Sequence, residues 1–340
     1  MTDTTVGLIL LLIAGTTNGS FTLPMKFTRK WAWENTWLVW SVFALLLFPP
    51  VVTFYTVPHV MDCFREAGVS IVVLVSACGA TWGVAQVLFG LAVNTMGIAL
   101  TFSIVLGISA AVGSIIPLLR LHQERIFSRG GLGVLLGVAL VVFGVVLCAI
   151  AGRRREAFLG STSGPGQRSP VGRGLAFAIG SGLGAAMVNL GLTFGGPLLQ
   201  RAQSHGAAPV WAPNAVWLPL MLAGAVPNIA YCLYLMRRNR TAGRFSESGT
   251  EAYWFCALIM ALFWFGSTSL YGVSAGKLGS WGTIIGWPLF MSLIVITASV
   301  LGIATGEWKD AGKVPLRIQL SGVAALILAV FVLSAASRWV

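Results

Sequence analysis

Charged residues are scarce in this chain, and their scarcity decides the class of protein. Only 9% of the 340 residues are Asp, Glu, Lys or Arg, while 56% are apolar; an ordinary soluble domain carries about 25% charged residues. The apolar residues form continuous runs, unlike the short alternating segments of a membrane barrel. Because lipid offers no water to unpaired backbone groups, such runs are expected to be helices. The composition therefore predicts an all-α integral membrane protein.

Residues that carry enzyme chemistry are also few and scattered. All three histidines fall in connections between apolar runs, and the five cysteines show no metal-ligand spacing. A membrane-embedded enzyme would need a nucleophile with its base, a metal cluster or a sizeable soluble loop. We therefore predict no catalytic residue, no metal site and no cofactor, and rank an enzyme or a sensor subunit as the third hypothesis, behind two kinds of transporter.

Acidic residues are missing from the centres of the apolar runs. A cation antiporter or a sodium symporter would normally place a carboxylate in the membrane interior, so ion coupling is limited to carboxylates near the ends of the runs. Glu34 is our proton-coupling candidate, because the tryptophans on either side of it could desolvate its carboxylate and favour proton binding. A helix N-terminal carboxylate, or a partner of Lys30, is an equally good interpretation of this residue.

Ten apolar runs are long enough to cross a bilayer, which requires about 20 residues per helix. The predicted spans cover residues 5–24, 36–57, 69–92, 97–119, 131–151, 174–195, 213–236, 252–274, 280–304 and 318–337. The first run is expected to be a retained span, because the residues before it lack the positive charge of a signal peptide.

Two stretches of the first half recur in the second half at offsets of 180 and 182. Two matches at nearly one offset indicate a structural unit used twice. The paired residues include Trp31 with Trp211, Trp37 with Trp217, Trp82 with Trp264 and Gly97 with Gly279.

The repeat divides the chain into two five-helix units. Residues 1–151 are predicted to form the first repeat, 152–173 a basic linker rich in Gly, Ser and Arg, and 174–340 the second repeat. Five is an odd number of spans, so the second repeat must enter the membrane in the opposite direction. Such inverted repeats are typical of alternating-access transporters, with the substrate held near the bilayer midplane.

The distribution of the Lys and Arg residues, which give the chain its net charge of +12, agrees with this topology. Fifteen of the 22 Lys and Arg residues fall in the odd-numbered connections between spans, and the positive-inside rule then places these connections in the cytoplasm and both termini outside. The three arginines of the fourth connection are the weakest part of this assignment. We expect the positive charge to serve the orientation of the chain during membrane insertion and its contact with the lipid bilayer. We expect no nucleic-acid partner.

Neutral polar and aromatic side chains within the spans are the substrate-site candidates. Flat aromatic faces beside neutral hydrogen-bonding groups suit a sugar, although helix packing is the more frequent role of small polar residues in a span and also of any one of these tryptophans. The candidates are Thr16, Asn18, Gln86, Asn189, Trp264, Thr268 and Trp287.

Several motifs resemble the L-rhamnose:proton symporter family, part of the drug/metabolite transporter superfamily. They are Lys30-Trp31-Ala32-Trp33-Glu34, Trp82-Gly83, Asn94-Thr95-Met96-Gly97-Ile98-Ala99, and Gly306-Glu307-Trp308 followed by Ala311-Gly312. The resemblance covers nearly the whole chain, and it implies ten helices in two inverted repeats and proton-coupled uptake of a deoxy sugar. The segment Leu278 to Pro288 departs from the family, being less polar and acidic, so the family is a firmer expectation than rhamnose as the substrate.

We therefore expect a secondary transporter that takes up a neutral monosaccharide with a proton, in the inner membrane of a bacterium. The second hypothesis is an uncoupled facilitator or an exporter of a small polar metabolite. Because the inverted repeat supplies internal pseudo-symmetry, an oligomer is not required to build the site.

Overall fold

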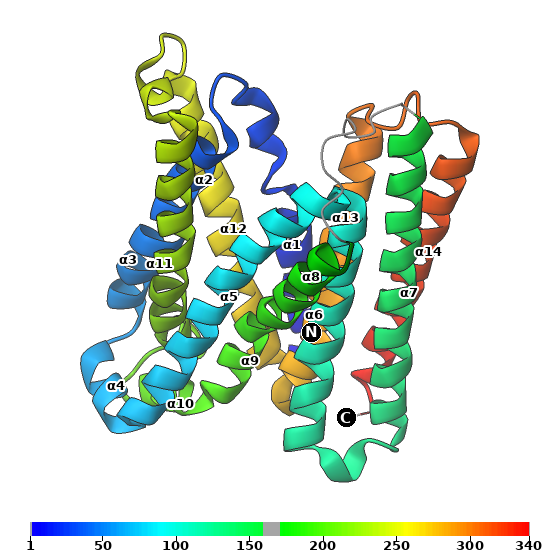
Figure 1. The fold of residues 1–340 in the computed structure, drawn as a ribbon. Coiled ribbons are helices and arrows are strands. Elements are labelled where there is room, and N and C mark those ends of the chain that lie inside the picture. Colours follow the sequence, from blue (N-terminus) through cyan, green and yellow to red (C-terminus); the bar gives the residue numbers. More distant parts are fainter. Residues whose placement is uncertain (1, 159–170, 340) are drawn as a thin grey trace.

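The protein is described by a computed structural model that covers residues 2–158 and 171–339. Every regular element of these residues is a helix, and ten helical stretches are long and apolar enough to span a membrane (Figure 1). The all-helical prediction with ten spans is thus confirmed. Residues 159–170 of the expected linker lie outside the described residues.

The spans follow one another in chain order, and most are single helices. They are formed by α1 (Asp3–Ser20) with η1 (Leu23–Phe27); α2 (Trp33–Ser41), η2 (Val42–Leu47) and α3 (Phe48–Thr56); α5 (Val69–Met96); α6 (Ile98–Leu121); α7 (Arg129–Phe158); α8 (Val171–Ala185) with α9 (Met187–Phe194); α11 (Asn214–Asn239); α12 (Glu251–Lys277); α13 (Gly282–Ala304); and α14 (Lys313–Ala336). Short connecting helices are α4 (Val60–Ala67), η3 (Gln123–Arg125), α10 (Gly196–Ser204), η4 (Ala242–Ser246) and η5 (Gly279–Trp281).

The second span is interrupted by a π-helical segment, η2. Pro49 and Pro50 follow it at the start of α3, and because proline has no backbone N–H, the ladder of helical hydrogen bonds must be rearranged upstream of such a pair. Segments of this kind are frequent at functional sites. Here the segment separates α3 from α2, which bears Glu34 and three tryptophans.

The helices pack as a two-fold pseudo-symmetry would require. The first helix of each half lies against the third and fourth spans of the other half: α1 packs on α12 and α13, and α8 packs on α5 and α6. The fifth spans of the two halves, α7 and α14, pack against each other, as do α6 and α13. This arrangement is consistent with the expected inverted repeat.

The second and seventh spans lie side by side in opposite directions. Glu34, at the start of α2, accepts a hydrogen bond from Asn239 at the end of α11. Asn214, its counterpart in the repeat, donates to Thr56 at the end of α3. Each half thus uses the same position to hold the far end of its partner span.

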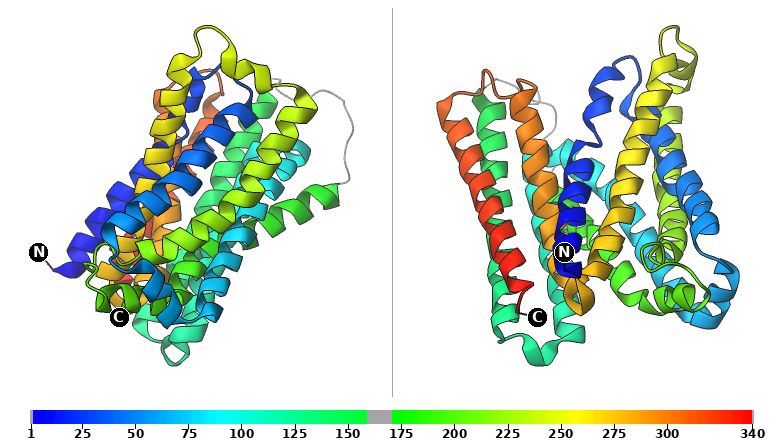
Figure 2. Two further views of the ribbon diagram at one scale, coloured as in Figure 1. Left: turned by 90° about the vertical axis from the view of Figure 1, so that its left-hand side faces the viewer. Right: turned by 180° about the vertical axis from the view of Figure 1, so that it is seen from behind.

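Basic connections gather at one end of the molecule, at the top in Figure 1, while the chain ends lie toward the other end (Figure 2). At the basic end, Lys26 pairs with Glu307 at 2.5 Å, and Lys30 donates to the carbonyl oxygen of Ser248 at 2.6 Å. Arg155 Nε donates to the carbonyl oxygen of Glu307 at 2.8 Å. These bonds join connections from different halves.

Candidate functional site

Five tryptophans form a continuous series of ring contacts that runs from one end of the second span into the protein interior. We call this series the tryptophan column. Its successive ring centroids are separated by 5.1, 4.5, 5.2 and 5.3 Å, and its members in order are Trp33, Trp37, Trp40, Trp264 and Trp82.

Helical spacing explains the outer part of the column. Trp33, Trp37 and Trp40 are separated by four and three residues, so their side chains share one face of α2. Trp33 is 38% exposed, whereas Trp40 is fully buried. The column therefore leads from the surface at the basic end to the core.

The inner end of the column is a stacked pair of tryptophans that occupy equivalent positions in the two repeats. Trp82 of α5 and Trp264 of α12 lie with their rings 22° from parallel, although α5 and α12 are not packed closely along their lengths. Gly224 lets α11 approach the indole of Trp82, since a Cβ there would lie 2.8 Å from the ring. The two halves thus meet through these indoles.

Neutral hydrogen-bonding groups surround the column. Asn18 of α1 donates to Ser267 Oγ at 2.8 Å, and Thr268 donates to the carbonyl oxygen of Trp264 at 2.8 Å. Trp37 Nε1 donates to Asn228 Oδ1 at 3.3 Å. Asn18, Thr268 and Asn228 are all buried, and they bring amide and hydroxyl groups from three helices, α1, α12 and α11, to this part of the interior.

A second buried cluster lies around Asn189. Its side-chain amide donates to the carbonyl oxygens of Gly113 at 2.7 Å and of Thr283 at 3.0 Å, and its Oδ1 accepts from the Tyr271 hydroxyl. Trp287 packs on Tyr271 at 5.5 Å between ring centroids. The amide of Asn189 is saturated by these bonds, which tie α9 to α6, α12 and α13.

Two candidates stand apart from both clusters. Thr16 is exposed on the face of α1 that also carries Leu12 and Ile13. Gln86 is half-buried on α5, one turn beyond Trp82, and the described residues offer its side chain no hydrogen bond. The structure thus brings Asn18, Trp264 and Thr268 together and places Asn189 with Trp287; a substrate role for each remains a prediction.

Glu34 is 4% exposed at the first turn of α2. Its carboxylate accepts hydrogen bonds from Asn239 Nδ2 at 3.0 Å and from Thr241 Oγ1 at 2.8 Å. Donors of this kind stabilise the ionised carboxylate and oppose the effect of desolvation. Lys30, the alternative ion-pair partner of Glu34, instead donates to the carbonyl oxygen of Ser248.

Comparison with known proteins identifies the family. The sequence model described as L-rhamnose-proton symport protein matches residues 1–337. This chain belongs to the L-rhamnose-proton symport protein family.

Relatives named L-rhamnose-proton symporter match over nearly their full length. The protein of Mannheimia succiniciproducens is 25% identical over 331 residues, covering 95% of each chain. That of Shigella dysenteriae is 23% identical over 332 residues and 96% of each chain. That of Cronobacter sakazakii is 24% identical, covering 96% of this chain and 95% of its own.

In this member of the symport family, sequence reasoning missed Trp40, Asn228 and Ser267 as neighbours of the candidate site. Asn228 is a mid-span amide next to Pro227, so the argument applied to Asn18 could have found it. Trp40 carries no such signal, because an apolar run conceals which of its tryptophans face the centre.

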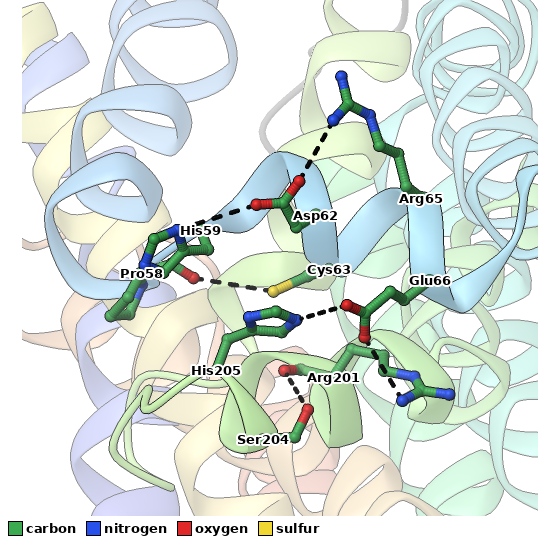
Figure 3. A network of polar contacts seen from close by, with 9 residues as sticks. All are labelled: Pro58, His59, Asp62, Cys63, Arg65, Glu66, Arg201, Ser204 and His205. Carbon is green, nitrogen blue, oxygen red and sulfur yellow. Dashed lines mark hydrogen bonds and ion pairs between the residues drawn. The ribbon is translucent and has the colours of Figure 1, made fainter.

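A polar network joins two connecting helices, α4 and α10 (Figure 3), which lie at the end opposite the basic connections, at the bottom of Figure 1. Glu66 accepts from His205 Nε2 at 3.0 Å and pairs with Arg201 at 3.4 Å. Beside it Cys63 contacts the carbonyl oxygen of Pro58, and burial raises the pKa of the Cys63 thiol, which keeps it protonated. Glu66 and Arg201 also line a cavity of about 410 Å³.

Within residues 2–158 and 171–339, no three His, Cys, Asp or Glu side chains lie together in a group that could hold a metal ion.

Proposed function

We propose that this protein takes up a neutral monosaccharide, L-rhamnose or a related sugar, together with a proton by alternating access. The observation that carries the proposal is the match of the whole chain to relatives named L-rhamnose-proton symporter. Family membership also favours transport over the enzyme and sensor hypotheses. The wider drug/metabolite transporter superfamily is part of this proposal.

The chemistry of the interior supports a neutral substrate. The tryptophan column and its neighbours supply aromatic faces, amides and hydroxyls, while Lys and Arg side chains lie in the connections and near the helix ends. A sugar can place its C–H face on an indole and its hydroxyls on amide groups. Asn18, Trp264 and Thr268 are the candidates that the structure groups for this role; Thr16, Gln86, Asn189 and Trp287 are the remaining candidates.

A proton would supply the driving force. Carrying one positive charge with a neutral sugar yields about 2.3 kcal/mol per 100 mV, which corresponds to roughly 50-fold accumulation. We propose Glu34 as the coupling group and the bacterial inner membrane as the location, with both termini outside. The buried carboxylate and the distribution of basic residues support these assignments.

The deciding experiment is uptake of labelled L-rhamnose into vesicles reconstituted with the purified protein, with and without an imposed inward proton gradient. We expect accumulation that disappears when the gradient is collapsed, and a panel of competing monosaccharides will rank the substrates. Equal flux with and without the gradient would favour an uncoupled facilitator. Absence of flux for every sugar tested would contradict the proposal.

A further inference from the structure

The stacked pair Trp82 and Trp264 has an unusual position for packing residues. The two tryptophans occupy equivalent positions in the two repeats. Their rings are in contact although the helices that carry them, α5 and α12, are not closely packed against each other. In an inverted-repeat transporter the substrate lies at the interface of the repeats. A pair of equivalent residues in mutual contact marks that interface.

We propose that Trp82 and Trp264 form a two-sided aromatic clamp for the sugar ring, an inference that rests on the proposed function. The clamp holds a neutral pyranose with one indole on each face. It selects rings with apolar C–H surfaces, such as 6-deoxyhexoses, because both contacts are made by flat apolar faces.

Geometry shows what the clamp must do to admit a sugar. Its ring centroids are 5.3 Å apart, and carbon atoms in contact are about 3.5 to 4.0 Å apart, so a ring held between two indoles needs about 7 to 8 Å. The indoles must therefore separate by about 2 to 3 Å. Movement of α5 relative to α12, as alternating access requires, provides that separation without disrupting a close helix contact.

A polar group beside the clamp is available to a sugar hydroxyl. Trp40 lies edge-on to Trp264, with centroids 5.2 Å apart. Its Nε1 is buried and has no hydrogen-bond partner among the described residues, whereas buried polar groups normally have one. A hydroxyl of the clamped sugar would satisfy this donor.

The rest of the column marks the end of the protein from which a sugar would reach the clamp. Trp37 and Trp33 continue the series of aromatic faces to the basic end, where Trp33 is exposed. When the protein opens toward that end, a sugar released from the clamp would meet these aromatic faces in turn.

Equilibrium binding of labelled L-rhamnose to purified full-length protein tests the clamp. Trp82→Leu and Trp264→Leu remove the aromatic face while keeping apolar bulk. The Kd should rise about two- to tenfold for each ring lost. The variants Trp82→Phe and Trp264→Phe should restore part of the affinity, and they preserve a test if a leucine variant fails to fold.

A matched control is Trp281→Leu. Like Trp40, Trp281 is a buried tryptophan whose Nε1 has no hydrogen-bond partner among the described residues. It lies outside the column, where it packs on His122. The Kd of the Trp281→Leu variant for L-rhamnose should equal that of the wild type. Trp40→Phe keeps an aromatic ring in the column but removes the indole N–H together with part of the ring area, and it should raise the Kd by a similar two- to tenfold, roughly one hydrogen bond.

The outcomes separate the clamp from the wider proposal. Folded Trp82 and Trp264 leucine variants that bind L-rhamnose like the wild type would overturn the clamp and leave proton-coupled uptake intact. A wild-type protein that binds and transports none of the sugars in the panel would remove the proposed function itself. Tight binding of uronates or sugar phosphates would contradict the neutral specificity of the clamp.

Discussion

Glu34 is buried at the start of α2 and is held there by Asn239, the last residue of the seventh span, and by Thr241 just beyond it. Protonation would weaken both hydrogen bonds, because a charged acceptor makes the stronger bonds. Proton binding would therefore loosen the attachment of α2 to the end of α11. This gives the residue a physical means of coupling a proton to movement of two spans.

Replacing Glu34 with Gln should abolish proton-driven accumulation while leaving exchange of labelled sugar across the membrane. The amide oxygen can still accept a hydrogen bond, but the side chain can no longer gain or lose a proton. Accumulation and exchange are measured in the same vesicles, with Glu251→Gln, an exposed carboxylate at the same end, as the control.

Two other results would assign Glu34 a different role. Loss of sugar binding together with accumulation would make it a structural attachment between α2 and α11. Full accumulation by the Gln variant would place proton coupling elsewhere in the protein.

At the scale of elements, α7 and α14 pack through small residues. A Cβ on Gly322 would lie 2.7 Å from Cys148 Sγ and 2.9 Å from both the Cys148 nitrogen and the Gly144 carbonyl oxygen. Two of these three atoms belong to the backbone and cannot move aside independently. Close approach of this kind is the usual means by which membrane helices associate.

Gly322→Ala should therefore destabilise the protein by about 1 to 3 kcal/mol, the usual cost of overpacking. Thermal unfolding in detergent measures the change. Gly90→Ala is the matched control, because Gly90 lies inside α5 and its Cβ would meet no atom within 4 Å; its midpoint should stay the same or rise. A Gly322 variant as stable as the wild type would contradict the packing described for α7 and α14.

The sequence predicted the spanning helices well but missed the elements between them. Ten hydrophobic runs were enough to place the spans, because the bilayer imposes their length and helical form. The helices α4 and α10 were missed, since each is only eight or nine residues long and carries charge. The π-helical segment was missed for a different reason: its residues, Val42 to Leu47, are indistinguishable by composition from an ordinary apolar helix.

The sequence offered candidate residues for the site one by one but not their arrangement. Trp82 and Trp264 were identified as repeat mates, yet their contact depends on how the two halves pack, which no local pattern encodes. Asn18 was chosen because an amide in lipid needs a partner; the structure supplies Ser267 as that partner, and a role of Asn18 in substrate binding stays a prediction. The exposure of Thr16 was hidden, because the phase of a nearly uniform apolar helix is weakly determined by its sequence.

On the scale of the whole molecule, the distribution of charge predicts the orientation in the membrane. The odd-numbered connections gather at one end and carry most of the Lys and Arg residues. Cytoplasmic retention of such residues should place this end inside the cell and both termini outside. The main opposing signal comes from three arginines at the end where α6 joins α7, namely Arg120, Arg125 and Arg129.

Single cysteines at the two ends would test this orientation in a background that lacks the five native cysteines. Gln123 and Ser246 are both exposed, the first between α6 and α7 and the second between α11 and α12. A membrane-impermeant maleimide applied to intact cells should label Gln123→Cys and spare Ser246→Cys, and both should react after permeabilisation. The reverse pattern would show that the arginines between α6 and α7 outweigh the larger group, and it would invert the direction in which the tryptophan column leads out of the membrane.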